Sequence, residues 1–148
     1  MISLNDPSLL KTDAFINGEF TAAVKDKRFS VTNPANGAVI AEVADFGADG
    51  IAAAIDAAEA ARLAWAARTA KDRAGILRRW YDLCIEHADD LATILTAEMG
   101  KPLAEAKGEI LYGSSFIEWF AKFWYNWSHI YLICYCPDQF TGFLTFFD

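Results

Sequence analysis

Cysteine, basic side chains and long apolar runs are all scarce in this 148-residue chain. The three cysteines, Cys84, Cys134 and Cys136, are too few and too unevenly placed for a disulfide framework. The net charge of −7 argues against a nucleic-acid-binding protein, because neutralising phosphates requires a basic surface. Residues 1–10 lack a basic region followed by an apolar run, so we expect no secretory signal and a cytoplasmic location.

The composition changes abruptly near residue 121. The last 26 residues, 123–148, hold ten aromatic side chains and no Ala, Glu, Lys or Arg, whereas the preceding 122 residues hold eleven aromatics. Residues 41–70, in contrast, include fourteen alanines. Because such different compositions rarely belong to one folding unit, we expect a boundary after Ala121. Residues 1–121, the body, would form one unit, and residues 122–148, the aromatic tail, would be unrelated to it.

Turn residues divide the first 45 residues into two short β-hairpins. Asn17-Gly18 supplies the two positive φ angles of a tight turn and has apolar residues on both sides. Residues 29–32 alternate apolar and polar side chains. The turn sequence Asn-Pro-Ala-Asn-Gly follows at 33–37, and a second strand is expected at 39–43.

After Asp45 the apolar spacing becomes helical and predicts three to four helices. They are expected at 48–68, at 70–87 behind a Thr69 capping box, at 88–99 and at 102–121. Gly100 is expected to end a helix in the left-handed conformation, and Pro102 to open the next one. Each helix carries a stripe of residues at helical spacing: Ile51, Ile55, Ala58, Arg62 and Trp65; Ile76, Leu77, Trp80, Leu83, Cys84 and His87; Leu91, Ile94, Leu95 and Met99; and Leu103, Ala106, Ile110, Ser114, Ile117 and Ala121.

Few residues of the body suggest chemistry. Gly100-Lys101 invites comparison with a phosphate loop, but it lacks the following hydroxyl and the upstream glycine, so we favour a solvated lysine at a helix junction. Cys84 has no evident base nearby, and we expect a buried small hydrophobe rather than a nucleophile. His87 is expected to interact with a helix end rather than to act in catalysis.

Three glutamates, Glu98, Glu105 and Glu109, are candidates for acid–base groups or metal ligands. Their spacings of seven and four place them roughly on one helix face. The Gly-Lys-Pro break spoils that register, so we expect solvated helix surface instead. Asp89-Asp90 is expected to favour a helix start.

Several short segments of the body occur in a characteristic order. They are Ile-Asn-Gly-Glu-Phe at 16–20, Val-Thr-Asn-Pro-Ala-Asn-Gly at 31–37, Asp-Arg followed by Ile-Leu within 72–77, and Glu-Met-Gly-Lys-Pro-Leu-Ala-Glu-Ala at 98–106. In this order they resemble the N-terminal part of an aldehyde dehydrogenase. The runs at 107–110 and 115–121, with Leu-Asn-Asp at 4–6, resemble the succinate-semialdehyde dehydrogenase branch. The resemblance covers about residues 4–121.

The resemblance implies an α/β enzyme with a Rossmann-like cofactor domain, a catalytic domain and an oligomerisation hairpin, several times longer than this chain. It implies that a cysteine thiolate forms a thiohemiacetal with the aldehyde, that hydride passes to NAD or NADP, and that water activated by a glutamate hydrolyses the thioester. The family's catalytic and cofactor-binding residues follow the region matched by residues 4–121. We therefore assign no catalytic, cofactor-binding or metal-binding residue. We expect this chain to bind neither NAD nor NADP, to be inactive and to aggregate, although the full-length family is homo-oligomeric.

The aromatic tail departs from the family and allows three interpretations. A shifted reading frame or truncated gene explains the abrupt change of composition. A membrane-surface anchor is the second, although the uncharged run at 123–137 is shorter than the roughly 20 residues that span a bilayer. The third is a replacement module, in which His129, Cys134 and Cys136 fall short of a four-ligand metal set. Two functions therefore remain: an inactive enzyme fragment, or a non-catalytic interaction or membrane-surface module that uses the tail.

Overall fold

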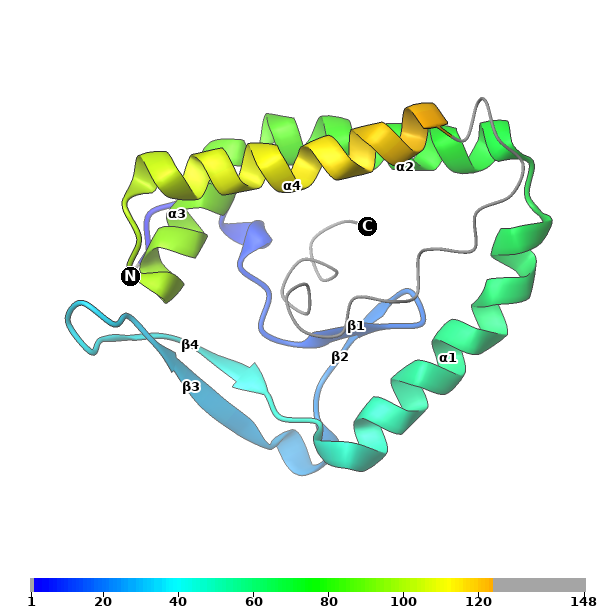
Figure 1. Cartoon of the computed structure of the whole chain (residues 1–148). Coiled ribbons are helices and arrows are strands. Elements are labelled where there is room, and N and C mark those ends of the chain that lie inside the picture. The colour runs from blue at the N-terminus through cyan, green and yellow to red at the C-terminus, as the bar shows by residue number, and fades with distance from the viewer. Residues whose placement is uncertain (1, 124–148) are drawn as a thin grey trace.

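The structure is a computed structural model that describes residues 2–123. Two small antiparallel hairpins precede four helices, and helix α1 diverges from a group formed by α2, α3 and α4 (Figure 1). This order agrees with the α/β family fold and with the expected hairpins and helices. The predictions for the aromatic tail, including the candidates His129, Cys134 and Cys136, lie outside the described residues.

The first hairpin joins β1 (Ala14–Ile16) to β2 (Glu19–Thr21) in antiparallel register. Asn17 and Gly18 have φ angles of 55° and 85°, so the predicted tight turn is confirmed. The Phe15 and Phe20 rings lie opposite each other, with centroids 5.2 Å apart. A short 3-10 helix, η1 (Pro7–Leu9), leads into this hairpin.

The second hairpin joins β3 (Arg28–Thr32) to β4 (Val39–Ala44). Its turn is held by the Asn33 side chain, which accepts from the Ala35 N–H at 2.9 Å, and by the backbone bond from Gly37 N to Asn33 O at 2.7 Å. A second 3-10 helix, η2 (Val24–Asp26), connects the two hairpins. The two strand pairs are separate sheets of two strands each.

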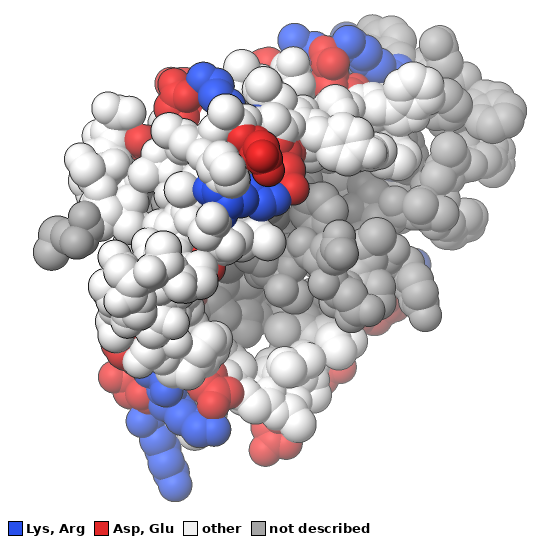
Figure 2. Space-filling model, turned by 60° about the vertical axis from the view of Figure 1, so that its left-hand side comes forward, with Lys and Arg blue, Asp and Glu red and all other residues white. Residues whose placement is uncertain are grey.

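Surface charges occur in groups of mixed sign. Figure 2 shows acidic and basic side chains side by side, separated by uncharged surface. Arg28, for example, pairs with Asp13 and Asp26, each at 2.8 Å. Arg78 of α2 bonds Glu118 of α4 at 3.3 Å, and Lys107 of α4 pairs with Asp89 of α3. Such exposed pairs orient neighbouring elements but contribute little stability individually.

Helix α1 (Gly47–Ala67) forms where the alanine-rich pattern predicts it, but no residue of it is buried. Ile51 and Ile55 are 57% and 62% exposed, and Leu63 is also exposed. The predicted helix is confirmed, but its stripe has no buried residue within residues 2–123. Helix propensity is a local property, whereas burial needs a partner surface that the other described elements do not provide.

Helices α2 (Ala70–Glu86) and α3 (Ala88–Met99) meet at His87. Thr69 caps α2 by accepting from the Asp72 N–H at 3.1 Å, which confirms the predicted cap. Gly100 ends α3 with φ 74° and ψ 11°, and its N–H bonds Thr96 O at 2.9 Å, which confirms the predicted left-handed end. Both acidic residues at the start of α3, Asp89 and Asp90, lie in its first turn, as expected.

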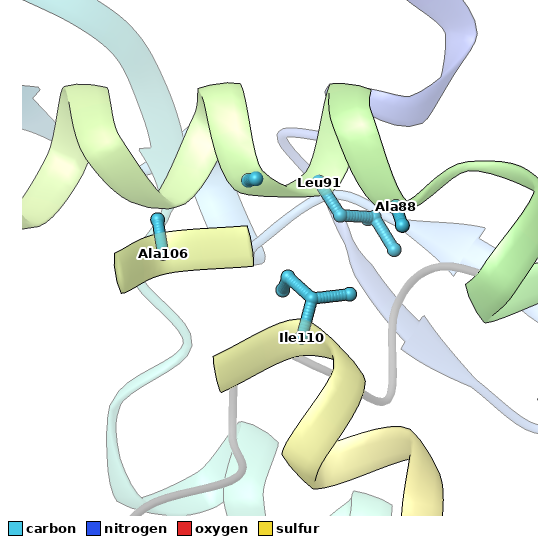
Figure 3. Packing of buried hydrophobic residues seen from close by; sticks show 5 residues of the cluster. Ala88, Leu91, Ala106 and Ile110 are labelled. Atoms are coloured by element: carbon cyan, nitrogen blue, oxygen red, sulfur yellow. The ribbon is translucent and has the colours of Figure 1, made fainter. Parts of the chain in front are cut away.

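The core lies where α4 (Leu103–Phe123) packs along α2 and α3. Pro102 precedes α4 and accepts the first helical bond, from Ala106 N at 3.0 Å. Figure 3 shows Ile110 of α4 pointing toward Leu91 and Ala88 of α3. The predicted stripe of α4 is buried at Ala106, Ile110, Ser114 and Ala121, and that of α2 and α3 at Leu77, Cys84, Leu91 and Ile94.

The predicted stripes extend too far at their margins. Met99 and Leu103, on either side of the α3–α4 junction, are 61% and 53% exposed, and Ile76 is 43% exposed. Periodicity marks the middle of a packed face well, but it cannot tell where the neighbouring helix stops covering that face.

Candidate functional site

The Gly100 junction meets the turn of the second hairpin. A Cβ atom on Gly100 would lie 2.8 Å from Pro34 Cγ, so the proline ring packs against the glycine backbone. Two of the segments that carry the family resemblance, 31–37 and 98–106, are thus brought together. The contact is apolar, and it sets the position of the hairpin against the end of α3.

Lys101 follows this junction and is paired with Glu109 of α4. Its side chain is only 19% exposed, so the expectation of a lysine free in solvent is wrong in this detail. Its partner lies eight residues along the chain, beyond the neighbours that define a phosphate-loop motif.

The other two glutamates are exposed helix residues, as expected. Partial desolvation raises the pKa of the Glu98 carboxyl, although the residue as a whole is exposed. Glu105 lies in the first turn of α4. Within residues 2–123, no three His, Cys, Asp or Glu side chains are placed to hold a metal ion.

Cys84 is fully buried at the interface of α2 and α4. Desolvation raises the pKa of its thiol, and a hydrogen bond with Ser114 offsets this only in part. A thiol held in its protonated form is a poor nucleophile, because the thiolate is the attacking species. His87, three positions along the chain, is half-buried and ends α2, as its expected interaction with the helix end requires.

Asp90 makes a contact that no pattern in the sequence indicates. Its carboxylate accepts from Asn5 N at 2.9 Å, Asn5 Nδ2 at 3.0 Å and Asp6 N at 2.8 Å, and the residue is 4% exposed. Hydrogen bonds from the backbone of Asn5 and Asp6 lower its pKa. The partners lie 84 and 85 residues away, which no local pattern can reveal. The contact ties the start of the chain to α3.

Within the described part of the chain, Trp80 Nε1 on α2 and Thr96 Oγ1 on α3 are buried without a hydrogen-bond partner. Buried polar groups normally have a partner in a complete fold. No helix in residues 2–123 is both long and apolar enough to cross a membrane.

Comparison with known proteins identifies the family. A model described as the aldehyde dehydrogenase family matches residues 20–133. The chain belongs to the aldehyde dehydrogenase family, and the resemblance noted in the sequence is confirmed.

The relatives include semialdehyde dehydrogenases. Succinate-semialdehyde dehydrogenase [NADP(+)] of Escherichia coli (strain K12) is 56% identical over 121 residues, which cover 82% of this chain and 25% of the relative. A glutarate-semialdehyde dehydrogenase of Pseudomonas putida is 52% identical over 82% of this chain and 25% of its own length. This chain therefore spans about a quarter of the curated relatives that it matches.

The solved structures give the same fold. The aldehyde dehydrogenase of Brucella melitensis biovar abortus 2308 superposes with a TM-score of 0.80 at 55% identity, over 82% of this chain and 25% of that chain. The hairpins and helices described above are therefore aldehyde dehydrogenase elements.

Proposed function

We propose that this chain is the N-terminal part of an NAD(P)-dependent aldehyde dehydrogenase of the succinate-semialdehyde type, and that it is inactive alone. The observation that carries the proposal is the 56% identity to an NADP-dependent succinate-semialdehyde dehydrogenase over 82% of the chain. The hairpin and helix order, which superposes on a solved family member with a TM-score of 0.80, supports the assignment of the part.

The complete enzyme would oxidise an aldehyde to a carboxylic acid through a cysteine-bound thiohemiacetal and thioester. That route needs an accessible thiolate and donors for the oxyanion. Cys84 does not meet this need, because it is fully buried and its thiol pKa is raised. Cys134 and Cys136 do not stand in the family's nucleophile motif. The role we assign to the body is therefore architectural.

The same reasoning applies to the cofactor. Lys101 is bound by Glu109 and does not fit a dinucleotide phosphate. We assign binding of NAD or NADP to the part of the enzyme beyond the matched quarter, and no step of the reaction to residues 2–123.

Assay of the purified chain tests this proposal. Succinate semialdehyde or glutarate semialdehyde would be offered with NAD or NADP, and formation of the reduced cofactor would be followed by absorbance. The Escherichia coli relative serves as the positive control. We expect no reduced cofactor above the rate without protein. Turnover that survives repeated purification and disappears with Cys84→Ala, Cys134→Ala or Cys136→Ala would overturn the proposed inactivity.

A further inference from the structure

Helix α4 carries large apolar side chains on two opposite sides. Ile110 and Ala121, on the side of the core between α4 and its neighbours, are 2% and 6% exposed (Figure 1). Three aromatic residues lie about 200° around the helix from this side, because each is two residues away from a buried position. They are Tyr112, Phe116 and Trp119, which are 68%, 45% and 59% exposed. We call these three residues the α4 face.

The α4 face is a preformed aromatic surface. The Tyr112 and Phe116 rings pack edge to face, with their centroids 4.9 Å apart. The opposite side of the helix is held in the core, so the rings are presented by a fixed element. Aromatic rings gain much from burial, and an exposed apolar patch of this kind on a helix marks a site of interaction.

The charges beside the α4 face are already paired. Residues 111–123 contain two charged side chains, Glu118 and Lys122. Glu118 accepts from Arg78 of α2 at 3.3 Å and pairs with Lys122 at 2.6 Å. A charged partner would therefore gain little from this half of α4 and would lose its own hydration. The surface fits an uncharged, aromatic partner instead.

The aromatic tail has this chemistry and begins where the α4 face ends. Residues 124–137 include five aromatic side chains and no Asp, Glu, Lys or Arg. Trp124 is twelve positions after Tyr112, a distance of about 18 Å along a helix. About six extended residues cover that distance. The fourteen residues of 124–137 are therefore long enough to turn and run back along the α4 face.

We propose that residues 124–137 of the aromatic tail fold back and dock on the α4 face of the same chain. Their attachment to the end of α4 gives them an effective concentration on the order of millimolar at this face, which favours the chain's own tail over a second copy in dilute solution. Docking requires only composition and proximity, whatever the origin of the tail, and it does not depend on the proposed function. It leaves the exposed apolar residues of β3 and α1 open.

Photo-cross-linking of the full 148-residue chain tests this contact. The photoreactive analogue benzoylphenylalanine would replace Phe116, and isotope-labelled and unlabelled chains would be refolded together at low concentration. We expect cross-links from position 116 to residues 124–137, in pairs of peptides that carry the same label. Leu111 is the matched control position, because it is 43% exposed on the same helix but lies outside the α4 face. The analogue at position 111 should give few of these cross-links.

Substitutions in the tail separate docking from unspecific collapse. Trp127→Asp combined with Tyr131→Asp should lower the cross-link yield from position 116 about tenfold, because burying an unpaired charge is costly. Thr141→Asp combined with Thr145→Asp adds the same charges beyond residue 137 and should leave the yield unchanged.

Three results would overturn the inference. Cross-links that join differently labelled chains as often as equally labelled ones would show that a second copy occupies the α4 face. Equal yields from positions 111 and 116 would show that the tail has no preference for this face. Cross-links from position 116 that avoid residues 124–137 would assign the face to another part of the chain.

Discussion

Asp90 joins the beginning of the chain to helix α3 through three hydrogen bonds, two of them from backbone N–H groups. The acceptor is a carboxylate, and hydrogen bonds to charged groups are stronger than neutral ones. Its neighbour Asp89 has a side chain that is 74% exposed and pairs with Lys107. Two adjacent acids in one helical turn therefore have different structural roles.

Replacing Asp90 with Asn should weaken this attachment. The amide keeps one acceptor oxygen but loses the charge and the second oxygen, and the backbone N–H groups of Asn5 and Asp6 each bond a different oxygen of Asp90. In a chimera in which residues 1–121 replace the matched region of the Escherichia coli subunit, we expect this substitution to lower the free energy of unfolding by about 1–2 kcal/mol, measured in urea. Asp89→Asn should cost no more than about 0.5 kcal/mol, because its ion pair is exposed. Equal losses in the two variants would show that the contact with Asn5 and Asp6 does not matter.

Acid should release the same contact. The pKa of Asp90 is lower in the folded chain, so its contribution is complete above the unfolded-state value of about 3.9 and is lost as the pH falls through the lower folded-state pKa. An NMR titration of the Asn5 amide should show this step at acidic pH. The step should be absent in Asp90→Asn, and a step that persists in that variant would assign the titration to another group.

At the scale of elements, glycine has two different physical roles in this chain: one glycine ends a helix with a positive φ angle, and another lies within a helix. Gly100 has a φ angle of 74°, and a Cβ atom there would lie 2.8 Å from Pro34 Cγ. Gly108 lies in α4, and a Cβ atom there would meet nothing within 4 Å apart from its chain neighbours and the nearby backbone of its own helix. Gly100→Ala should destabilise by about 1–2 kcal/mol or more, from left-handed strain and contact with Pro34. Gly108→Ala should stabilise by about 0.5–1 kcal/mol through helix propensity.

The measurement is the urea midpoint of each variant in the chimera. Combining Gly100→Ala with Pro34→Ala tests the origin of the strain. Removing the ring should recover the part of the loss that comes from the contact and leave the part that comes from φ. No recovery would mean that the hairpin turn does not pack on the junction.

The sequence predicted those elements whose cause is local. Asn17-Gly18 sets its own turn, Thr69 caps α2, and Gly100 ends α3, because each depends on residues within one turn. The sequence could not predict which element packs on a given apolar helix face. The stripe on α1 has helical spacing, yet no described element buries it. Met99 and Leu103 belong to predicted stripes but lie beyond the edge of the packed core. The Asp90 contact was missed for the same reason, since its partners are distant in sequence.

Of the candidate residues, the burial of Cys84 was predictable from the sequence. A cysteine at a helical apolar position is typical of core packing, and Cys84 is fully buried beside Ser114. The pairing of Lys101 with Glu109 was not predicted, because a phosphate-loop motif is defined only by residues that are close together in the chain. The family itself was recognisable because short segments kept their order, and the comparisons confirm it.

At the scale of the whole molecule, the described surface leaves many large apolar side chains open. They include residues of β3, α1 and α4, such as Phe29 at 54%, Leu63 at 67% and Trp119 at 59% exposed. We expect the isolated chain to self-associate, because exposed apolar patches of this kind drive aggregation. Sedimentation velocity should show species larger than the monomer that increase with concentration. A stable monomer with cooperative unfolding would contradict this expectation.

The measurement that tests the account most directly is turnover by the chimera that carries residues 1–121 in place of the matched quarter of the Escherichia coli enzyme. If this body is an aldehyde dehydrogenase part with an architectural role, the chimera should oxidise succinate semialdehyde with NADP. Its kcat/KM should lie within about tenfold of the parent enzyme, a difference of about 1.4 kcal/mol in transition-state stabilisation. A chimera that folds and assembles like the parent but shows no turnover would contradict the account.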